Sequence, residues 1–233
     1  MDLINKYQHR IVIEITLVII IMGGIFLAGL LSGRAEIGLF SVLAGWLFIW
    51  IRMRMQKRNW GDFGFYRPDN WLKTILLALG WLVFFQVFIG WIFKPLVVRL
   101  TGKPLDISEF EVIRGNFSVL LRGLAIVWTI AAFGEEMVFR GYFLNRIKDV
   151  FPSRKTGYIW AVLGSSLVFG LGHIYQGISG LILAVIAGIF YSLVFILSEK
   201  NLWVPILVHG LYDTWAFLVL FFGLDNKINP FMV

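Results

Sequence analysis

The chain has 233 residues, of which 59% are hydrophobic and 15% are charged, and its mean hydropathy is +0.81. Soluble domains carry roughly 25% charged residues, so this composition indicates a protein of the lipid bilayer. The net charge of +7 fits the basic loops that orient membrane proteins and does not indicate nucleic-acid binding. The absence of cysteine excludes disulfides, thiolate nucleophiles and cysteine-based metal sites.

Seven apolar stretches follow one another along the chain, and helices are the form that satisfies their backbone in hydrocarbon. The stretches are Ile11–Leu31, Ile37–Ile51, Trp71–Val98, Val119–Phe133, Tyr158–Gly172, Ile178–Leu197 and Leu202–Phe222. The first exceeds a signal-peptide core and is expected to be retained. The second is short, and the third is long enough to tilt or break. The sequence therefore predicts an all-α, polytopic transmembrane helix bundle with about seven (six to eight) transmembrane helices, and residues 1–233 are expected to form a single integral membrane domain.

Basic residues predict the orientation of the bundle. They cluster after the second and the fourth stretch, and they are Arg52, Arg54, Lys57, Arg58, Arg67, Lys73, Arg146, Lys148, Arg154 and Lys155. A cytoplasmic N-terminus places both clusters in the cytoplasm, as the positive-inside rule requires, and a plasma (inner) membrane is the expected location. The mixed segment Asp106–Ser118 is predicted to form a short interfacial helix before the fourth span.

Two adjacent glutamates and an arginine follow the fourth apolar stretch. Charges at bilayer depth are costly and usually face a protein interior or a water-filled cavity. Glu136 and Arg140 are four residues apart, so they share a helix face and are predicted to form an ion pair. Glu135 lies about 100° around the helix from Glu136. It has no obvious local cation, which makes it the candidate general base. A helix-end ion pair at the membrane surface is the structural alternative.

Two histidines occupy equally apolar settings. His173 follows a stretch of small residues, which let helices approach closely, and it shares a helix face with Phe169. His209 shares a face with Asp213, and that pair could bind a metal, hold a tautomer or hydrogen-bond a reacting oxygen. The structural alternatives are an interfacial histidine at a helix end and a His–Asp pair that joins helices. Because their depths are compatible, we expect Glu135, His173 and His209 to converge on one buried polar site.

These motifs resemble the signature of the CPBP intramembrane proteases, which include the CAAX prenyl endopeptidases and the bacteriocin-processing enzymes. The motifs are Glu135-Glu136-x-x-x-Arg140, Phe169-x-x-x-His173 and His209-x-x-x-Asp213, in that order. The resemblance covers the second half of the chain, and the catalytic half is expected at about residues 119–222.

The resemblance implies an intramembrane endopeptidase in which Glu135 and His173 activate a water for attack on a peptide carbonyl. His209 and Asp213 would face the oxyanion. The supporting residues would be Glu136, Arg140 and Phe169. The family often has asparagine where this chain has Asp213. An ionised aspartate cannot donate a hydrogen bond to an oxyanion, so Asp213 would be protonated or would orient His209.

The use of a metal is a separate question. Two histidines and one or two carboxylates can ligate zinc, and the ligands would then be Glu135, His173 and His209. The chain lacks a His-Glu-x-x-His helix, the usual signature of zinc proteases. The partner-free position of Glu135 favours water activation without a metal. No cofactor is therefore expected, and zinc is the alternative.

The main hypothesis is an endopeptidase whose partners are the lipid bilayer and a membrane-associated peptide or protein substrate. The substrate's identity, its prenylation and the oligomeric state are not defined by the sequence. A non-catalytic peptide-binding or bacteriocin self-immunity membrane protein is the second hypothesis. A transporter is the third, because intramembrane Glu and His can relay protons, but no inverted repeat or paired broken helices support it. The change Glu135→Gln separates the first two, because it inactivates a protease and need not affect a binder.

Overall fold

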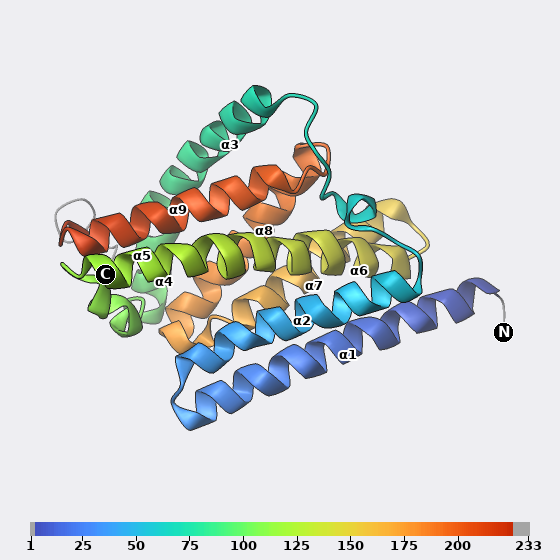
Figure 1. Ribbon diagram of the computed structural model, residues 1–233, viewed down its shortest axis with the longest axis horizontal. Helices are drawn as coiled ribbons and strands as arrows, with labels where there is room; N and C mark the ends of the chain where they lie inside the picture. Colours follow the sequence, from blue (N-terminus) through green and yellow to red (C-terminus); the bar gives the residue numbers. More distant parts are fainter. Residues whose placement is uncertain (1–2, 226–233) are drawn as a thin grey trace.

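The computed structural model describes residues 3–225, and these residues form an all-helical bundle without strands. Figure 1 shows most helices running roughly along one long axis, with α3 inclined to them on one side of the bundle, next to α9. The uninterrupted long helices are α1 (Leu3–Ser32), α2 (Ala35–Met55), α7 (Arg154–Leu171), α8 (Gly177–Leu197) and α9 (Trp203–Phe221).

Two other long helices change geometry along their length. The first consists of α3 (Trp71–Phe85), a π-helical segment (Gln86–Phe93) and α4 (Lys94–Thr101). The second consists of α5 (Phe117–Ile126), two π-helical segments (Val127–Glu135 and Met137–Phe143) and α6 (Leu144–Val150). The third apolar stretch, which could have broken, is therefore one continuous helix.

Six helices within the described residues are long and apolar enough to cross a membrane, so the protein is an integral membrane protein. They are Lys6–Ser32, Ile37–Met55, Trp71–Thr101, Phe117–Val150, Ile174–Leu197 and Trp203–Phe221. This confirms the predicted polytopic helix bundle, at the lower end of the predicted range of spans. The seventh predicted helix, α7, is also present but is less apolar, because it begins with Arg154 and Lys155 and carries Ser165 and Ser166.

Small residues let α7 and α8 pack closely, as the sequence predicts. A Cβ atom at Gly170 of α7 would lie 3.0 Å from the carbonyl oxygen of Leu181, and one at Gly188 of α8 would lie 2.9 Å from the Cβ of Ser166. Such distances leave no room for a side chain at either glycine. The close contact brings the backbone of α8 to the end of α7 that carries Phe169.

We expect Gly188→Ala to destabilise the protein by roughly 1–3 kcal/mol, because the added methyl group overpacks the contact with Ser166. Gly164→Ala is the matched control, since its Cβ would meet only Ile147 at 3.5 Å, an ordinary contact distance. Thermal unfolding in detergent compares the two variants. Equal midpoints for both would contradict the close approach of α7 and α8.

A buried ionic cluster joins the first two helices to α6. Glu14 of α1 is 2% exposed, and its carboxylate accepts hydrogen bonds from Arg52 (2.6 Å), Gln56 (2.7 Å) and Arg146 (2.7 Å). Arg146 is one of the basic residues that follow the fourth apolar stretch. It lies within the last turns of the fourth helix, which continues to Val150, and it is buried. The cluster therefore fixes the α1–α2 hairpin against the motif-bearing half of the chain.

The segment before the fourth span contains the predicted short helix, as a 3-10 helix at Ser108–Ile113. Arg114 follows it and donates to both carboxylate oxygens of Asp225, at 2.7 and 2.8 Å. These bonds hold the pKa of Asp225 below its usual value. The same segment reaches the residues after His173, since the Asp106 amide donates to the Gln176 carbonyl at 3.1 Å. This places the 3-10 helix near one edge of the site described next.

Candidate functional site

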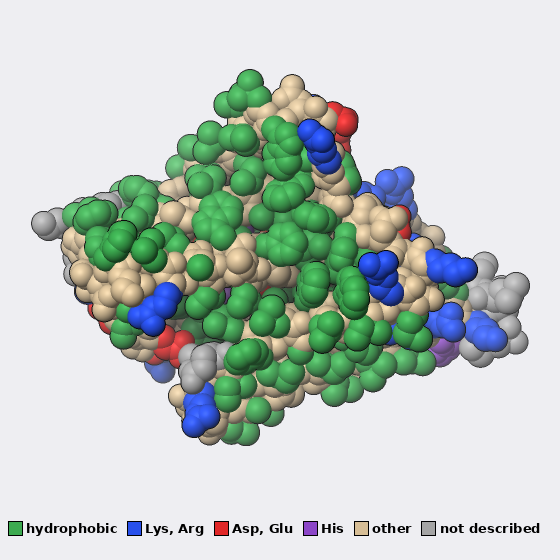
Figure 2. All heavy atoms as spheres, viewed as in Figure 1, with side chains coloured by type: hydrophobic (Ala, Val, Ile, Leu, Met, Phe, Trp, Pro, Cys, Tyr) green, Lys and Arg blue, Asp and Glu red, His purple; other side chains and the backbone are tan. Residues whose placement is uncertain are grey.

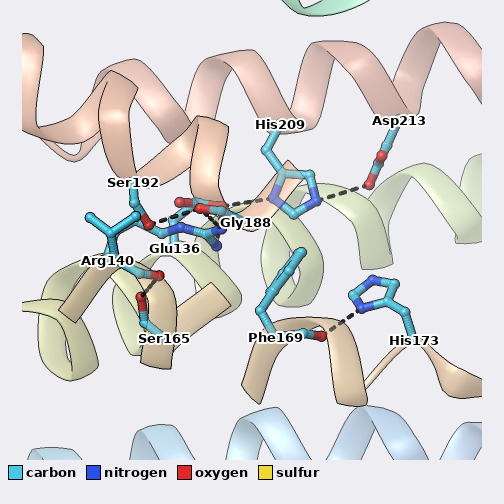
Figure 3. Close-up of polar contacts among 10 residues, drawn as sticks. Glu136, Arg140, Ser165, Phe169, His173, Gly188, Ser192, His209 and Asp213 are labelled. Carbon is cyan, nitrogen blue, oxygen red and sulfur yellow. Dashed lines mark hydrogen bonds and ion pairs between the residues drawn. The ribbon is translucent and has the colours of Figure 1, made fainter. Parts of the chain in front are cut away.

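The carboxylate of Glu136 lies at the centre of a buried polar cluster. Its side chain is fully buried, and Oε1 accepts a hydrogen bond from Arg140 Nη1 at 3.0 Å. The ion pair predicted from the spacing is therefore present. The same oxygen lies 3.0 Å from Nδ1 of His209, on a helix 73 residues further along the chain. Figure 3 shows these contacts between the fourth long helix and α9.

Arg140 is enclosed on all sides. Its side chain is 1% exposed, and Nη2 donates to the carbonyl oxygen of Gly188 at 3.1 Å. The guanidinium carbon lies 4.6 Å from the ring centre of Phe169 and 5.1 Å from that of Tyr191. Aromatic faces attract cations most strongly where water is excluded. Phe169 thus contacts the supporting ion pair as well as the histidine four residues later.

His209 lies between two carboxylates. Its Nδ1 faces Glu136, and its Nε2 lies 3.4 Å from Asp213, whose side chain is 27% exposed. The ring stacks on Tyr191 with centroids 4.8 Å apart. A protonated imidazole can donate from both nitrogens, whereas a neutral one donates from one. The arrangement therefore suits a histidine that presents N–H donors and whose ring orientation is fixed.

His173 follows the end of α7 and precedes a 3-10 turn at Ile174–Gln176. Its Nδ1 lies 2.9 Å from the carbonyl oxygen of Phe169, and the two rings are 4.7 Å apart. A carbonyl oxygen only accepts hydrogen bonds, so Nδ1 carries the proton and Nε2 of the neutral ring is an acceptor. Nε2 of His173 is therefore available as a base, and the residue is only partly buried.

Glu135 is partly buried, and its Oε2 is buried with no hydrogen-bond partner among the described residues. It lies close enough to His209 and Asp213 to interact with their charges. Near this part of the cluster, the ring of Tyr175 stacks on His173 with centroids 6.2 Å apart. Oε2 of Glu136 likewise has no hydrogen-bond partner, but Oε1 of Glu136 contacts Arg140 and His209. Glu135, by contrast, makes no hydrogen bond or ion pair within residues 3–225, in line with its lack of a local cation in the sequence.

Packing beside His209 sets the position of α9. A Cβ atom at Gly210 would lie 2.7 Å from the ring of Trp128, and the Trp128 indole donates to Thr214 Oγ1 at 3.1 Å. Trp128 belongs to the first π-helical segment of the fourth helix, which ends at Glu135. The glycine lets α9 lie directly on this segment, so His209 reaches Glu136.

The residues of the site do not form a ready zinc site. Among the described residues, no group of three His, Cys, Asp or Glu side chains is arranged to hold a metal ion. Both ring nitrogens of His209 already face carboxylates, and Nδ1 of His173 faces a carbonyl oxygen. To bind an ion together with Glu135 and with Nε2 of His173, His209 would have to give up one of its two carboxylate contacts.

Three residues that contact the polar cluster were not predicted from the sequence: Tyr175, Gly188 and Tyr191. Tyr191 stacks on His209, Gly188 accepts from Arg140, and Tyr175 stacks on His173. Two of them lie in the apolar stretch of α8, where no charge or motif distinguishes them. Only Tyr175 could have been suspected from the sequence, because it is a polar aromatic residue two positions after His173.

Fold and site together define a polytopic membrane protein whose second half encloses a carboxylate–histidine–arginine cluster. Residues 117–215 match the family model described as type II CAAX prenyl endopeptidase Rce1-like, so the chain carries an Rce1-like domain over these residues. This confirms the family resemblance of the sequence motifs, and all seven motif residues lie within the matched range. Comparisons with the curated proteins and with the solved structures give no match.

Proposed function

We propose that the protein is an intramembrane endopeptidase that hydrolyses a peptide bond in a membrane-associated peptide or protein. The observation that carries the proposal is that Glu135, unlike Glu136, makes no hydrogen bond or ion pair within the described residues, although its Oε2 is buried. A carboxylate held in this way is available to accept a proton from water. The match of residues 117–215 to a protease family supports the same assignment.

In the proposed reaction, a water between Glu135 and His173 attacks the carbonyl carbon of the substrate. Its proton passes to Glu135 or to Nε2 of His173, and the carbonyl oxygen becomes an oxyanion. The carbon–nitrogen bond then breaks as the same proton is delivered to the leaving amine. His173 suits this role because the Phe169 carbonyl fixes its proton on Nδ1.

His209 is the proposed donor to the oxyanion. The Glu136 carboxylate orients it from one side, and Arg140 holds that carboxylate in place. Donors that are fixed before the reaction stabilise developing charge without a cost of reorganisation. The donating group is Nε2–H, because Nδ1 faces Glu136. Nε2 lies 3.4 Å from Asp213, which orients the ring before the reaction, and Nε2–H turns from Asp213 to the oxyanion as that charge forms; Asp213 is not itself the donor.

The reaction is proposed to need no metal. Because the residues as arranged do not fit zinc, no step is assigned to it. Hydrolysis by the purified protein should therefore survive strong chelators, whereas a metal held by two histidines and a carboxylate would be removable or exchangeable. If a chelator abolished hydrolysis and added zinc restored it, the reaction would require a metal and the proposal would be wrong.

The orientation proposed for the bundle has the N-terminus in the cytoplasm of a plasma (inner) membrane. In Figure 1, the start of α1, the end of α2 and the end of α6 lie at the same end of the bundle. The two clusters of basic residues lie at or just after the ends of α2 and α6. This shared end supports the positive-inside assignment. Labelling of single cysteines placed at either end of α1, which the cysteine-free chain permits, tests it.

We expect Asp213→Asn to retain activity within about tenfold of the natural protein, because an amide can still hydrogen-bond the His209 ring or donate to the oxyanion. Asp213→Leu, which has similar size and no hydrogen-bonding group, should lose about 100-fold or more, since His209 is no longer held in place. Initial rates for both purified variants provide the test. If asparagine is as damaging as leucine, the charge of Asp213 is required, and the orienting role assigned here is wrong.

The function itself is tested by identifying a substrate. Membranes from cells that make the natural protein or the Glu135→Gln variant are compared for new peptide termini, and the implicated peptide is then offered to the purified protein in liposomes. Cleavage by the natural protein and its absence with the variant support an endopeptidase. A peptide that binds equally to both proteins and is cleaved by neither would instead identify a peptide-binding membrane protein.

A further inference from the structure

We propose that a groove along the α1–α2 hairpin binds an anionic phospholipid of the surrounding bilayer. The groove encloses about 750 Å³ and lies outside the polar site, on helices that carry none of the three motifs. Its lining residues are Lys6, Tyr7, His9, Arg10, Ile13, Glu14, Leu17, Phe48 and Arg52.

The groove is basic at one end and apolar at the other. On α1, Lys6 and Arg10 are one turn apart and are followed on the same side by Leu17. On α2, Phe48 lies one turn before Arg52. The two helices run in opposite directions side by side (Figure 1), so both walls change from basic to apolar in the same direction. A ligand that fits has an anionic head and an apolar tail in that order.

The one acidic residue of the groove does not cancel its positive charge. The Glu14 carboxylate is 2% exposed and is engaged by Arg52 and Arg146 inside the bundle. Arg52 is 26% exposed and lines the groove; its Nη2 contacts Glu14 and its Nη1 contacts only the sulfur of Met55, a weak acceptor, at 3.6 Å. Lys6 and Arg10 make no ion pair within the described part of the chain, and both are exposed.

The position of the groove favours a lipid as its occupant. Lys6 begins the first candidate span, and Arg52 lies one turn before the second span ends, where helices meet lipid headgroups. Ile13 and Leu17, which line its apolar half, are 58% and 42% exposed. Figure 2 shows basic side chains gathered at this end of the molecule and hydrophobic side chains covering the adjacent face. Basic pockets between membrane helices bind anionic headgroups, and a free phosphate ion would gain nothing from the apolar half.

The test measures lipid binding to the purified full-length protein by native mass spectrometry. Dioleoyl phosphatidylglycerol, the anionic probe, is compared with dioleoyl phosphatidylcholine, which has the same chains and no net charge. Dihexanoyl phosphatidylglycerol and inorganic phosphate carry the negative charge with short chains or with none. We expect tight binding of the long-chain anionic lipid alone.

The double variant Lys6→Gln/Arg10→Gln should bind dioleoyl phosphatidylglycerol about 30-fold more weakly. Arg67→Gln/Lys73→Gln is the matched control, because it removes the same charge from exposed positions that do not line the groove. This control should bind like the natural protein. Both altered pairs are exposed, so both variants should fold.

Three results would overturn the proposal. Equal binding of phosphatidylcholine would show that the groove does not select anionic lipids. Equal binding of inorganic phosphate would show that the site takes the free ion. An equal loss of affinity in the control variant would show a general effect of net charge. None of these results bears on the protease assignment, because the assay measures binding at residues outside the polar site.

Discussion

The Glu135→Gln protein is expected to hydrolyse peptide about 100- to 10,000-fold more slowly than the natural protein, because an amide cannot accept the proton of the attacking water. Folding and membrane insertion should be unchanged. Oε2 of Glu135 has no hydrogen-bond partner among the described residues, so the substitution breaks no bond to that oxygen. Initial rates with the purified protein, together with its thermal unfolding midpoint, provide the measurement.

Two further substitutions sharpen this test. Glu135→Asp keeps the charge and withdraws the carboxylate by one methylene, and a displacement on the order of 1 Å can cost about 100-fold in rate. Glu199→Gln makes the same chemical change at an exposed position outside the site and should be fully active. Near-normal hydrolysis by a folded Glu135→Gln protein would rule out Glu135 as the general base.

The second large effect concerns the buried ion pair. Arg140→Met keeps most of the side-chain volume and leaves the Glu136 carboxylate buried without its arginine, which should lower the free energy of unfolding by about 3–5 kcal/mol. Adding Glu136→Gln removes the uncompensated charge, so the double variant should be more stable than Arg140→Met alone. Denaturant unfolding in mixed micelles measures both.

The single variant Glu136→Gln completes the cycle of mutants. Every variant without Arg140 also loses the hydrogen bond to Gly188 and the contacts with Phe169 and Tyr191. These losses are common to both variants without Arg140, so they cancel in the coupling energy, which then reports the interaction between Glu136 and Arg140 alone. A double variant that is no more stable than Arg140→Met would show that the two charges do not depend on each other.

The sequence by itself determined the helices and the contacts within one helix. Apolar runs of spanning length predicted the bundle because hydrocarbon leaves the backbone no partner except itself. The spacing of Glu136 and Arg140 predicted their ion pair, since residues four apart share a face of any regular helix. Glu135 was likewise identified as the carboxylate without a partner.

Only the tertiary structure decided which helix faces meet. Glu136 contacts His209 across 73 residues, and Glu14 contacts Arg146 across 132 residues. Spacing along the chain carries no information on such pairs, because it defines the faces of each helix separately. Which faces meet depends on packing between helices, here on glycines such as Gly210 that admit a neighbouring ring. The π-helical segments around Glu135 and Glu136 also change the direction of their side chains relative to a regular α-helix, and the periodicity of the sequence did not indicate them.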